Sequence, residues 1–211
     1  MHVRRILYTN LLLILLGLVF PAMATSETAG EIIKSTAGKL LERLHAEKDQ
    51  ITRQPDRIYE LVNELLVPRF DFVSISRAVL GTSWKSASEV QQQLFVEQFK
   101  TLLIRTYTNT LRQYADNEIV YYPEITGKSS DQSVVRTEVR GIPGINAVPI
   151  HYRLRLDNGA WKVVDVSVDG ISLVSTYRNS FASDVRNNGL DALISKLVDH
   201  NRRNQVAGSQ D

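Results

Sequence analysis

Two aspartates are the residues in this sequence whose position could support acid–base chemistry. Asp165 and Asp169 lie four residues apart, in and just after a valine-rich segment. A carboxylate inside an apolar cup can act as a general base. The structural interpretation is that Asp169 makes a strand-end hydrogen bond and Asp165 makes a buried or edge contact. Because nothing nearby in the sequence offers a second catalytic group, we expect no enzymatic activity from this pair.

Other side chains with reactive potential lack the spacing that a site requires. His45, His151 and His200 are far apart and do not form the H-x-x-x-H pattern of a metal site, so we expect each to be solvated. Residues 170–174 resemble a nucleophile elbow around Ser172 but lack its final glycine. The chain has no cysteine, which removes thiol chemistry and disulfides. The sequence therefore predicts no metal and no cofactor.

The first 24 residues have the pattern of a secretory signal peptide. Arg4 and Arg5 form a positive region, a short apolar run follows, and Ala22-Met23-Ala24 supplies a small-x-small cleavage site. The apolar run of about 15 residues is shorter than the roughly 20 needed to span a bilayer. We therefore expect cleavage after Ala24. No cysteine follows that could carry a lipid anchor, so the mature protein is expected to be soluble.

Composition indicates one globular domain without an affinity for nucleic acid. Arg4 and Arg5 leave with the signal peptide, so the 25 basic and 23 acidic residues of the full chain become 23 of each. A neutral mature chain lacks the basic excess of nucleic-acid-binding proteins. An apolar content of 43% and a charged content of 23% are ordinary for a folded domain. We expect that domain over residues 25–204 and a flexible tail over residues 205–211.

Hydrophobic periodicity divides the chain into helices, then strands, then helices. The expected elements are helices at about 27–47, 55–66, 70–79 and 87–115, strands at 118–126, 133–140, 147–157 and 160–169, and helices at 171–187 and 190–203. The segment from Ser86 to Glu89 reads as a capping box that opens the longest helix. This order predicts an α+β fold with an antiparallel sheet of about four strands packed against helices.

The last two strands show which side chains share a face. In the third strand, apolar Ile150 and Tyr152 alternate with polar His151, as expected for a sheet with one wet face. In the fourth strand Val163 and Val166 fall on opposite faces of a regular strand. Either a bulge near Val163–Val164 or burial on both faces would explain this switch. Periodicity alone otherwise indicates an ordinary packed core.

Two segments give the chain a resemblance to a known family. They are FDFVSISRAVLGTSWK at residues 70–85 and GAWKVVDVSVDGISLV at residues 159–174, with the long aromatic helix between them. Together they resemble the MlaC family, also called the toluene-tolerance family, over about residues 27–200. Its members are periplasmic phospholipid-binding proteins of the Mla intermembrane lipid-transport system.

The resemblance implies a fold, a cargo and partners. The implied fold is the NTF2-like cone, in which a curved sheet and helices enclose an apolar pocket for acyl chains. The implied function is a soluble periplasmic carrier that shuttles phospholipid between an outer-membrane lipoprotein complex and an inner-membrane ABC transporter with MCE-domain subunits, maintaining outer-membrane lipid asymmetry. Phospholipid is then cargo and not a cofactor. The mature carrier does not span a membrane.

The expected pocket residues are those whose predicted faces converge between the sheet and the long helix. They are Val79, Leu80, Phe99, Leu103, Tyr107, Tyr152, Leu154, Val166, Val168, Ile171 and Val174. Two alternatives remain open. One is an NTF2-like enzyme that acts on a small hydrophobic substrate with Asp165 or Asp169 as base. The other is a periplasmic adaptor that binds only proteins and has a filled core.

Overall fold

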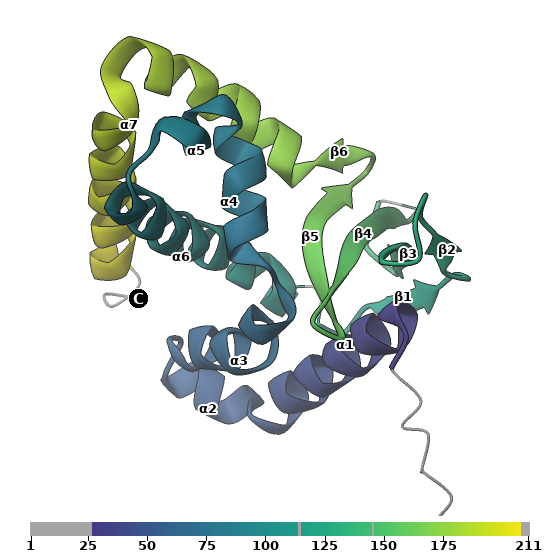
Figure 1. Ribbon diagram of the computed structural model, residues 1–211. Helices are drawn as coiled ribbons and strands as arrows, with labels where there is room; N and C mark the ends of the chain where they lie inside the picture. The colour runs from purple at the N-terminus through teal and green to yellow at the C-terminus, as the bar shows by residue number, and fades with distance from the viewer. Residues whose placement is uncertain (1–26, 114, 145, 208–211) are drawn as a thin grey trace, which may run out of the picture.

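The computed structural model describes residues 27–113, 115–144 and 146–207, so the expected signal peptide lies outside the described residues. The described part of the chain begins with helices (Figure 1). They are α1 (Ala29–Ala46), α2 (Lys48–Arg53), α3 (Arg57–Leu65), the short 3-10 helix η1 (Val67–Arg69), α4 (Phe72–Leu80), α5 (Thr82–Ser86) and α6 (Glu89–Gln113).

Strands and one long kinked helix complete the chain. They are β1 (Glu118–Tyr121), β2 (Ile125–Thr126), β3 (Gln132–Arg140), β4 (Val148–Asp157), β5 (Ala160–Val168), β6 (Ile171–Ser172) and α7 (Leu173–Ala207). The strands form one antiparallel sheet in the order β1-β3-β4-β5-β6, with β2 also paired to β3. The predicted α+β class with an antiparallel sheet is confirmed.

Two boundaries differ from prediction for local reasons, and a third agrees with it. The single strand expected over residues 118–126 is wrong: it is divided into β1 and β2 around Pro123, which has no N–H to give to a ladder. The short strand β6 occupies residues where a helix was expected to begin. The sheet therefore has six strands and not about four. The predicted helix break after residue 187 is confirmed, since α7 is kinked at Gly189, whose φ is 83°.

The predicted capping box of α6 is wrong by two residues. Ser88 and Gln91 form the reciprocal pair: Ser88 N–H donates to Gln91 Oε1 (3.0 Å), and Gln91 N–H donates to Ser88 Oγ (3.2 Å). Ser86 instead ends α5, where its hydroxyl donates to the Ser83 carbonyl oxygen (3.2 Å). The local sequence offers two serines at suitable spacing, and the helix α5 takes the first of them.

A bulge in β5 resolves the switch of faces. Leu154 of β4 pairs with Val163, and Arg153 pairs with Asp165, so Val164 has no partner across this pair of strands. The extra residue brings Val166 to the same face as Val163. At this point Val163 also accepts a hydrogen bond from Asp71 N–H (3.0 Å), which joins the start of α4 to the sheet.

The register defines an inner and an outer face of the sheet. Antiparallel partners share a face, so Val135 and Tyr152 lie on the same side, and they pack with Ala29 and Ile33 of α1. We call this side the inner face. The alternating residues form the outer face, which is polar and carries Arg136, Glu138, His151, Arg153, Arg155 and Asp165.

The buried side chains form three clusters. One lies among α4, α5, α6 and α7 and contains stacked aromatic rings. A second lies between α1 and the inner face of the sheet, and a third joins α1, α2 and α3. Phe70 packs against both the first and the second cluster. Figure 1 shows the same arrangement, with α4–α7 beside the edge of the sheet at β5 and α1 below it.

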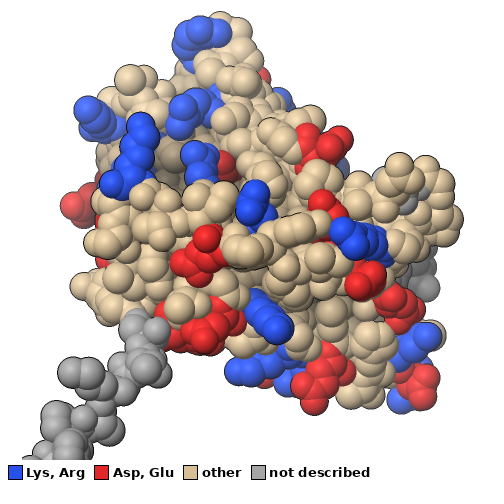
Figure 2. All heavy atoms as spheres, turned by 90° about the vertical axis from the view of Figure 1, so that its right-hand side faces the viewer, with Lys and Arg blue, Asp and Glu red and all other residues tan. Residues whose placement is uncertain are grey.

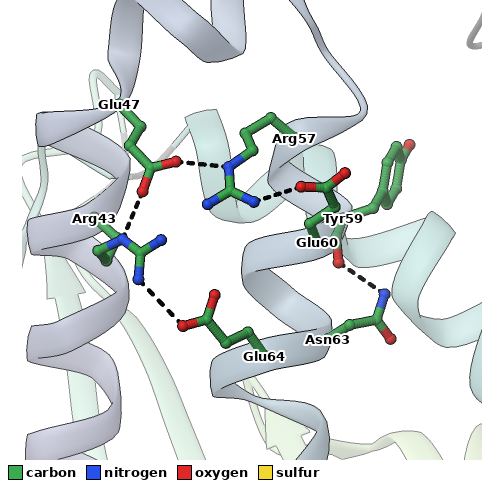
Figure 3. Close-up of polar contacts among 7 residues, drawn as sticks. All are labelled: Arg43, Glu47, Arg57, Tyr59, Glu60, Asn63 and Glu64. Carbon is green, nitrogen blue, oxygen red and sulfur yellow. Dashed lines mark hydrogen bonds and ion pairs between the residues drawn. The ribbon is translucent and has the colours of Figure 1, made fainter.

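An arginine–glutamate network fixes the turn from α1 to α3 (Figure 3). Glu47 accepts hydrogen bonds from Arg57 Nε (2.7 Å) and Arg43 Nε (2.5 Å), and Arg43 also reaches Glu64 (3.2 Å). The bonds from Arg57 and Arg43 hold the pKa of Glu47 below its usual value. The network thus links the same helices whose apolar residues, such as Leu40 and Leu61, form the third cluster.

Charges of both signs are distributed over the surface. Figure 2 views the molecule from the right-hand side of Figure 1, and Asp and Glu side chains there are interspersed with Lys and Arg. Lys and Arg gather at the upper left of this view, whereas its lower half has both signs. Among the described residues, no helix is long and apolar enough to cross a membrane.

Candidate functional site

The inner face of the sheet carries an apolar surface that α1 covers only in part. Val166 pairs with Tyr152, Val168 pairs with Ile150, and Ile171 of β6 continues the row. Burial falls along this row, because Val168 is 36% exposed and Ile171 is 64% exposed. Neighbouring exposed apolar residues on one face indicate a surface that another apolar group can cover.

The structure divides the eleven predicted pocket residues among different environments. Those in the helical cluster are Val79, Leu80, Phe99, Leu103 and Val174. Those in the sheet cluster are Tyr152, Leu154 and Val166. Val168 and Ile171 lie at the exposed end of the sheet, and Tyr107 lies beside Tyr177. The residues are therefore not brought into a single cluster, although Phe70 bridges the two larger groups.

Several of the predicted residues are fully enclosed by protein. Phe99 is 1% exposed, and its ring lies 5.0 Å from that of Tyr177 and 5.8 Å from that of Phe181. Val79 and Leu154 are each 2% exposed. These side chains belong to the packed core, whereas Leu103, Tyr107, Tyr152 and Val166 are only partly buried.

Two tyrosines place phenol groups on the mostly apolar inner face. Burial raises the pKa of Tyr121. Burial also raises the pKa of Tyr152, although a hydrogen bond with Thr137 opposes the shift. Tyr177, outside the sheet, has its pKa raised to about 12 by burial and by the nearby Tyr107. All three phenols therefore remain neutral at physiological pH, which suits them to an apolar surface.

Tyr121, Ile150 and Phe70 lie on or beside this apolar surface but were absent from the predicted set. Tyr121 pairs with Thr137, and Ile150 pairs with Val168, so both lie on the inner face. Strand alternation was the signal for Ile150. The interruption at Pro123 obscured the alternation around Tyr121. Phe70 precedes α4, and only the tertiary fold shows that it meets both clusters.

Asp165 is fully engaged in holding the end of the sheet to α7. It is 3% exposed. Its carboxylate accepts hydrogen bonds from Arg153, from Ser172 Oγ (2.7 Å) and from Val174 N–H (3.2 Å). Asp169 occupies an exposed turn with φ 49°, and its N–H donates to the Pro149 carbonyl oxygen (2.9 Å). The geometry thus supports the structural interpretation of both aspartates, and neither carboxylate points into an apolar cup as a free base.

The histidines are in separate surroundings. His45 bonds to the Leu41 carbonyl oxygen through Nδ1 (2.8 Å) and to Asp116 through Nε2 (2.8 Å). His151 is half-buried on the outer face. Within the described ranges no group of three or more His, Cys, Asp or Glu residues is arranged to hold a metal ion.

One surface depression lies on the outer face of the sheet. Its volume is about 180 Å³, and it is lined by Tyr122, Arg136, Thr137, Glu138, Pro149 and His151. Sites for drug-sized ligands have volumes of about 300–1,000 Å³ and mostly apolar walls. This depression is smaller and has charged side chains in its walls, so it is not the expected acyl-chain pocket.

Comparison with known proteins identifies the family. A family model described as MlaC protein matches residues 34–199. This chain belongs to the MlaC family. The toluene tolerance protein ttg2D of Pseudomonas putida is 32% identical over 192 residues, which cover 89% of this chain and 86% of that protein. The MlaC binding protein of the Haemophilus influenzae intermembrane phospholipid transport system is 24% identical over 193 residues, covering 90% of each chain.

A solved structure extends the likeness to the fold. The phospholipid-binding protein from Ralstonia solanacearum, solved in complex with a phospholipid, is 29% identical to this chain. It superimposes with a TM-score of 0.76, covering 84% of this chain and 98% of that one. These three relatives are named for phospholipid binding, phospholipid transport or toluene tolerance, and none of these names denotes an enzyme.

Proposed function

We propose that this protein is a soluble periplasmic phospholipid carrier of the Mla type. The observation that carries the proposal is the partly uncovered apolar inner face in a chain whose structural relative was solved with a phospholipid. Membership in the MlaC family supports the same function. The expected partners are an outer-membrane lipoprotein complex and an inner-membrane ABC transporter with MCE-domain subunits.

The energetics of lipid transfer explain why such a carrier needs an apolar surface. Each buried methylene group contributes about 0.8 kcal/mol, so two long acyl chains lose roughly 20 kcal/mol or more of favourable burial on entering water. A carrier lowers this cost if it covers the chains with side chains such as Val166, Val168 and Ile171. The headgroup contributes little to that term, so we expect weak discrimination between headgroups.

The inner face suggests where the acyl chains are held. We assign them to the surface formed by Tyr121, Ile150, Tyr152, Val166 and Val168, with Ile171 at its exposed end. The remaining predicted residues, in the helical cluster, support this surface from behind or become accessible when the clusters around Phe70 move apart. Asp165 takes no chemical part, because its carboxylate is occupied by donors.

Lipid extraction from the purified mature protein tests the proposal. After gentle purification from its native compartment, mass spectrometry of the extract is expected to show phospholipid in a stoichiometric amount. Protein stripped of lipid is then expected to remove phospholipid from vesicles. A folded protein that contains no lipid and takes none from vesicles would contradict the proposal.

A further inference from the structure

The depression on the outer face is separate from the proposed lipid surface. Arg136 pairs with His151, and Glu138 pairs with Pro149, so these side chains alternate with the inner-face residues of β3 and β4. The backbone of the sheet therefore lies between this depression and the apolar inner face. A ligand here would not compete with acyl chains.

Arg136 is the side chain that makes the depression unusual. Its Nε is buried and has no hydrogen-bond partner, and its guanidinium lies over the Tyr122 ring at 6.0 Å. Within the described part of the chain it forms no ion pair, whereas Arg153 pairs with Asp165 and Arg155 pairs with Asp71. A buried donor without an acceptor is unfavourable. Because Nε is enclosed, a ligand in the depression would bond to the terminal nitrogens of the guanidinium, which donate to none of the described residues.

Among the described residues that line the depression, the only carboxylate is already engaged. Glu138 Oε2 accepts two hydrogen bonds from Arg140, at 2.8 Å and 3.2 Å, and Arg140 also donates to the Tyr122 hydroxyl oxygen (3.0 Å). Glu138 and Arg140 thus neutralise each other at the rim. The positive charge of Arg136 remains, with the half-buried His151 beside it on the neighbouring strand.

We propose that this depression binds a small oxyanion, with a phosphate group as its ligand class. The planar guanidinium of Arg136 supplies a fork of donors that suits phosphate oxygens, and His151 supplies a further N–H. One water occupies roughly 30 Å³ of liquid, so a volume of about 180 Å³ accommodates one phosphate group with bound water. The phosphate group comes either from inorganic phosphate or from a lipid headgroup. The assignment does not depend on the lipid-carrier proposal.

A phosphate titration followed by NMR tests the site. Inorganic phosphate is added to the mature protein, and chemical shifts are expected to change saturably around Arg136 and His151. The variant Arg136→Gln removes the fork and is expected to bind at least about ten-fold more weakly, as for loss of a charge-assisted hydrogen bond. The control Arg186→Gln removes the same charge from an exposed position on α7 and is expected to bind as the parent does.

A vesicle arm distinguishes the two sources of phosphate. Binding is compared for phosphatidylcholine vesicles with and without phosphatidylglycerol. Loss of binding to the anionic vesicles in Arg136→Gln alone, without a response to inorganic phosphate, supports a headgroup as the source. Absence of a localised response to either probe, or equal loss in both arginine variants, overturns the proposal. If Arg136→Gln does not fold, His151→Gln replaces it under the same criteria.

Discussion

Asp165 and Val166 are neighbours in β5 but point to opposite faces of the sheet. Asp165 is on the outer face, where it gathers donors from β4, β6 and the start of α7. Val166 is on the inner face, opposite Tyr152. Asp165 therefore links β4, β6 and the start of α7, and Val166 contributes to the apolar inner face.

Replacing Asp165 with asparagine is expected to destabilise the protein without a change of function in the folded fraction. The amide has one acceptor oxygen in place of two, so at least one donor loses its partner. We expect the free energy of unfolding to fall by about 2 kcal/mol. Urea denaturation measures it. The control is Asp169→Asn, at an exposed turn where asparagine tolerates the positive φ, and its stability is expected to be unchanged.

Replacing Val166 with glutamine is expected to weaken lipid uptake. An amide that lacks a partner on an apolar surface costs about 1–3 kcal/mol, so the affinity for phospholipid is expected to fall roughly ten-fold. Uptake from vesicles by the stripped protein gives the measurement. Ser167→Gln, which changes the adjacent outer-face residue, is the matched control. Equal uptake by folded Val166→Gln and the parent would exclude Val166 from the lipid surface.

At the scale of elements, Asp71 links the helical cluster to the sheet. It caps α4 by accepting from Ser74 N–H (2.9 Å), and it pairs with Arg155 of β4 (2.9 Å). Arg155 also donates to Ser74 Oγ (2.7 Å). Burial raises the pKa of Asp71, but the bonds from Ser74 and the charge of Arg155 outweigh it, so the pKa lies below its ordinary value.

The contribution of Asp71 to stability is expected to depend on pH. A carboxylate whose pKa is depressed in the folded state stabilises that state above its unfolded pKa of about 3.9, and the stabilisation is lost as the pH falls through the folded value. Asp71→Ala is therefore expected to cost about 1 kcal/mol at pH 7, as for loss of a helix cap. The difference from the parent is expected to shrink below about pH 4. Denaturation at several pH values measures this, and a constant difference would contradict it.

Strand patterns were easier to predict from the sequence than the site. The alternation around Ile150 and Tyr152 correctly placed the inner face, because a two-residue period depends on the strand alone. The α6 cap was misplaced, since two serines compete locally and the presence of α5 decides between them.

The site residues were harder to predict because tertiary contacts decide which element covers each apolar face. Periodicity shows that Phe99 is on an apolar helix face but not which element covers that face. In the structure Phe99 packs against Tyr177 and Phe181 of α7, whereas α1 is the helix that packs on β3. The predicted set therefore mixed core residues with surface residues.

At the scale of the whole molecule, the fold depends on packing without disulfides. The chain contains no cysteine, and its buried residues form three clusters that meet through a few side chains such as Phe70. In the proposed carrier, separate clusters of this kind would let cargo enter and leave without unfolding the protein. Polar links at Asp71 and Asp165 keep the helical cluster in place against the sheet.

Export is a property of the whole chain that can be measured directly. Cleavage after Ala24 is expected to give a mature protein that begins at Thr25. Expression in a Gram-negative host followed by intact-mass measurement of the periplasmic fraction checks this. Replacing Ala22 and Ala24 with larger residues is expected to leave the precursor uncut. A mature mass that retains Arg4 and Arg5 in the parent would contradict the assignment.

The bulge in β5 shows that one residue can change the shape of a strand without changing the faces to which the other side chains point. Val164 has no partner in β4, so its deletion would leave Trp161, Val163, Val166 and Val168 in phase and Asp165 pointing outward. The shortened strand would keep its pattern of faces but lose the local bend and twist that a bulge provides. In the proposed carrier, a flatter sheet is expected to give acyl chains less room, so we expect cargo capacity to depend on Val164 as well as on the side chains that line the surface.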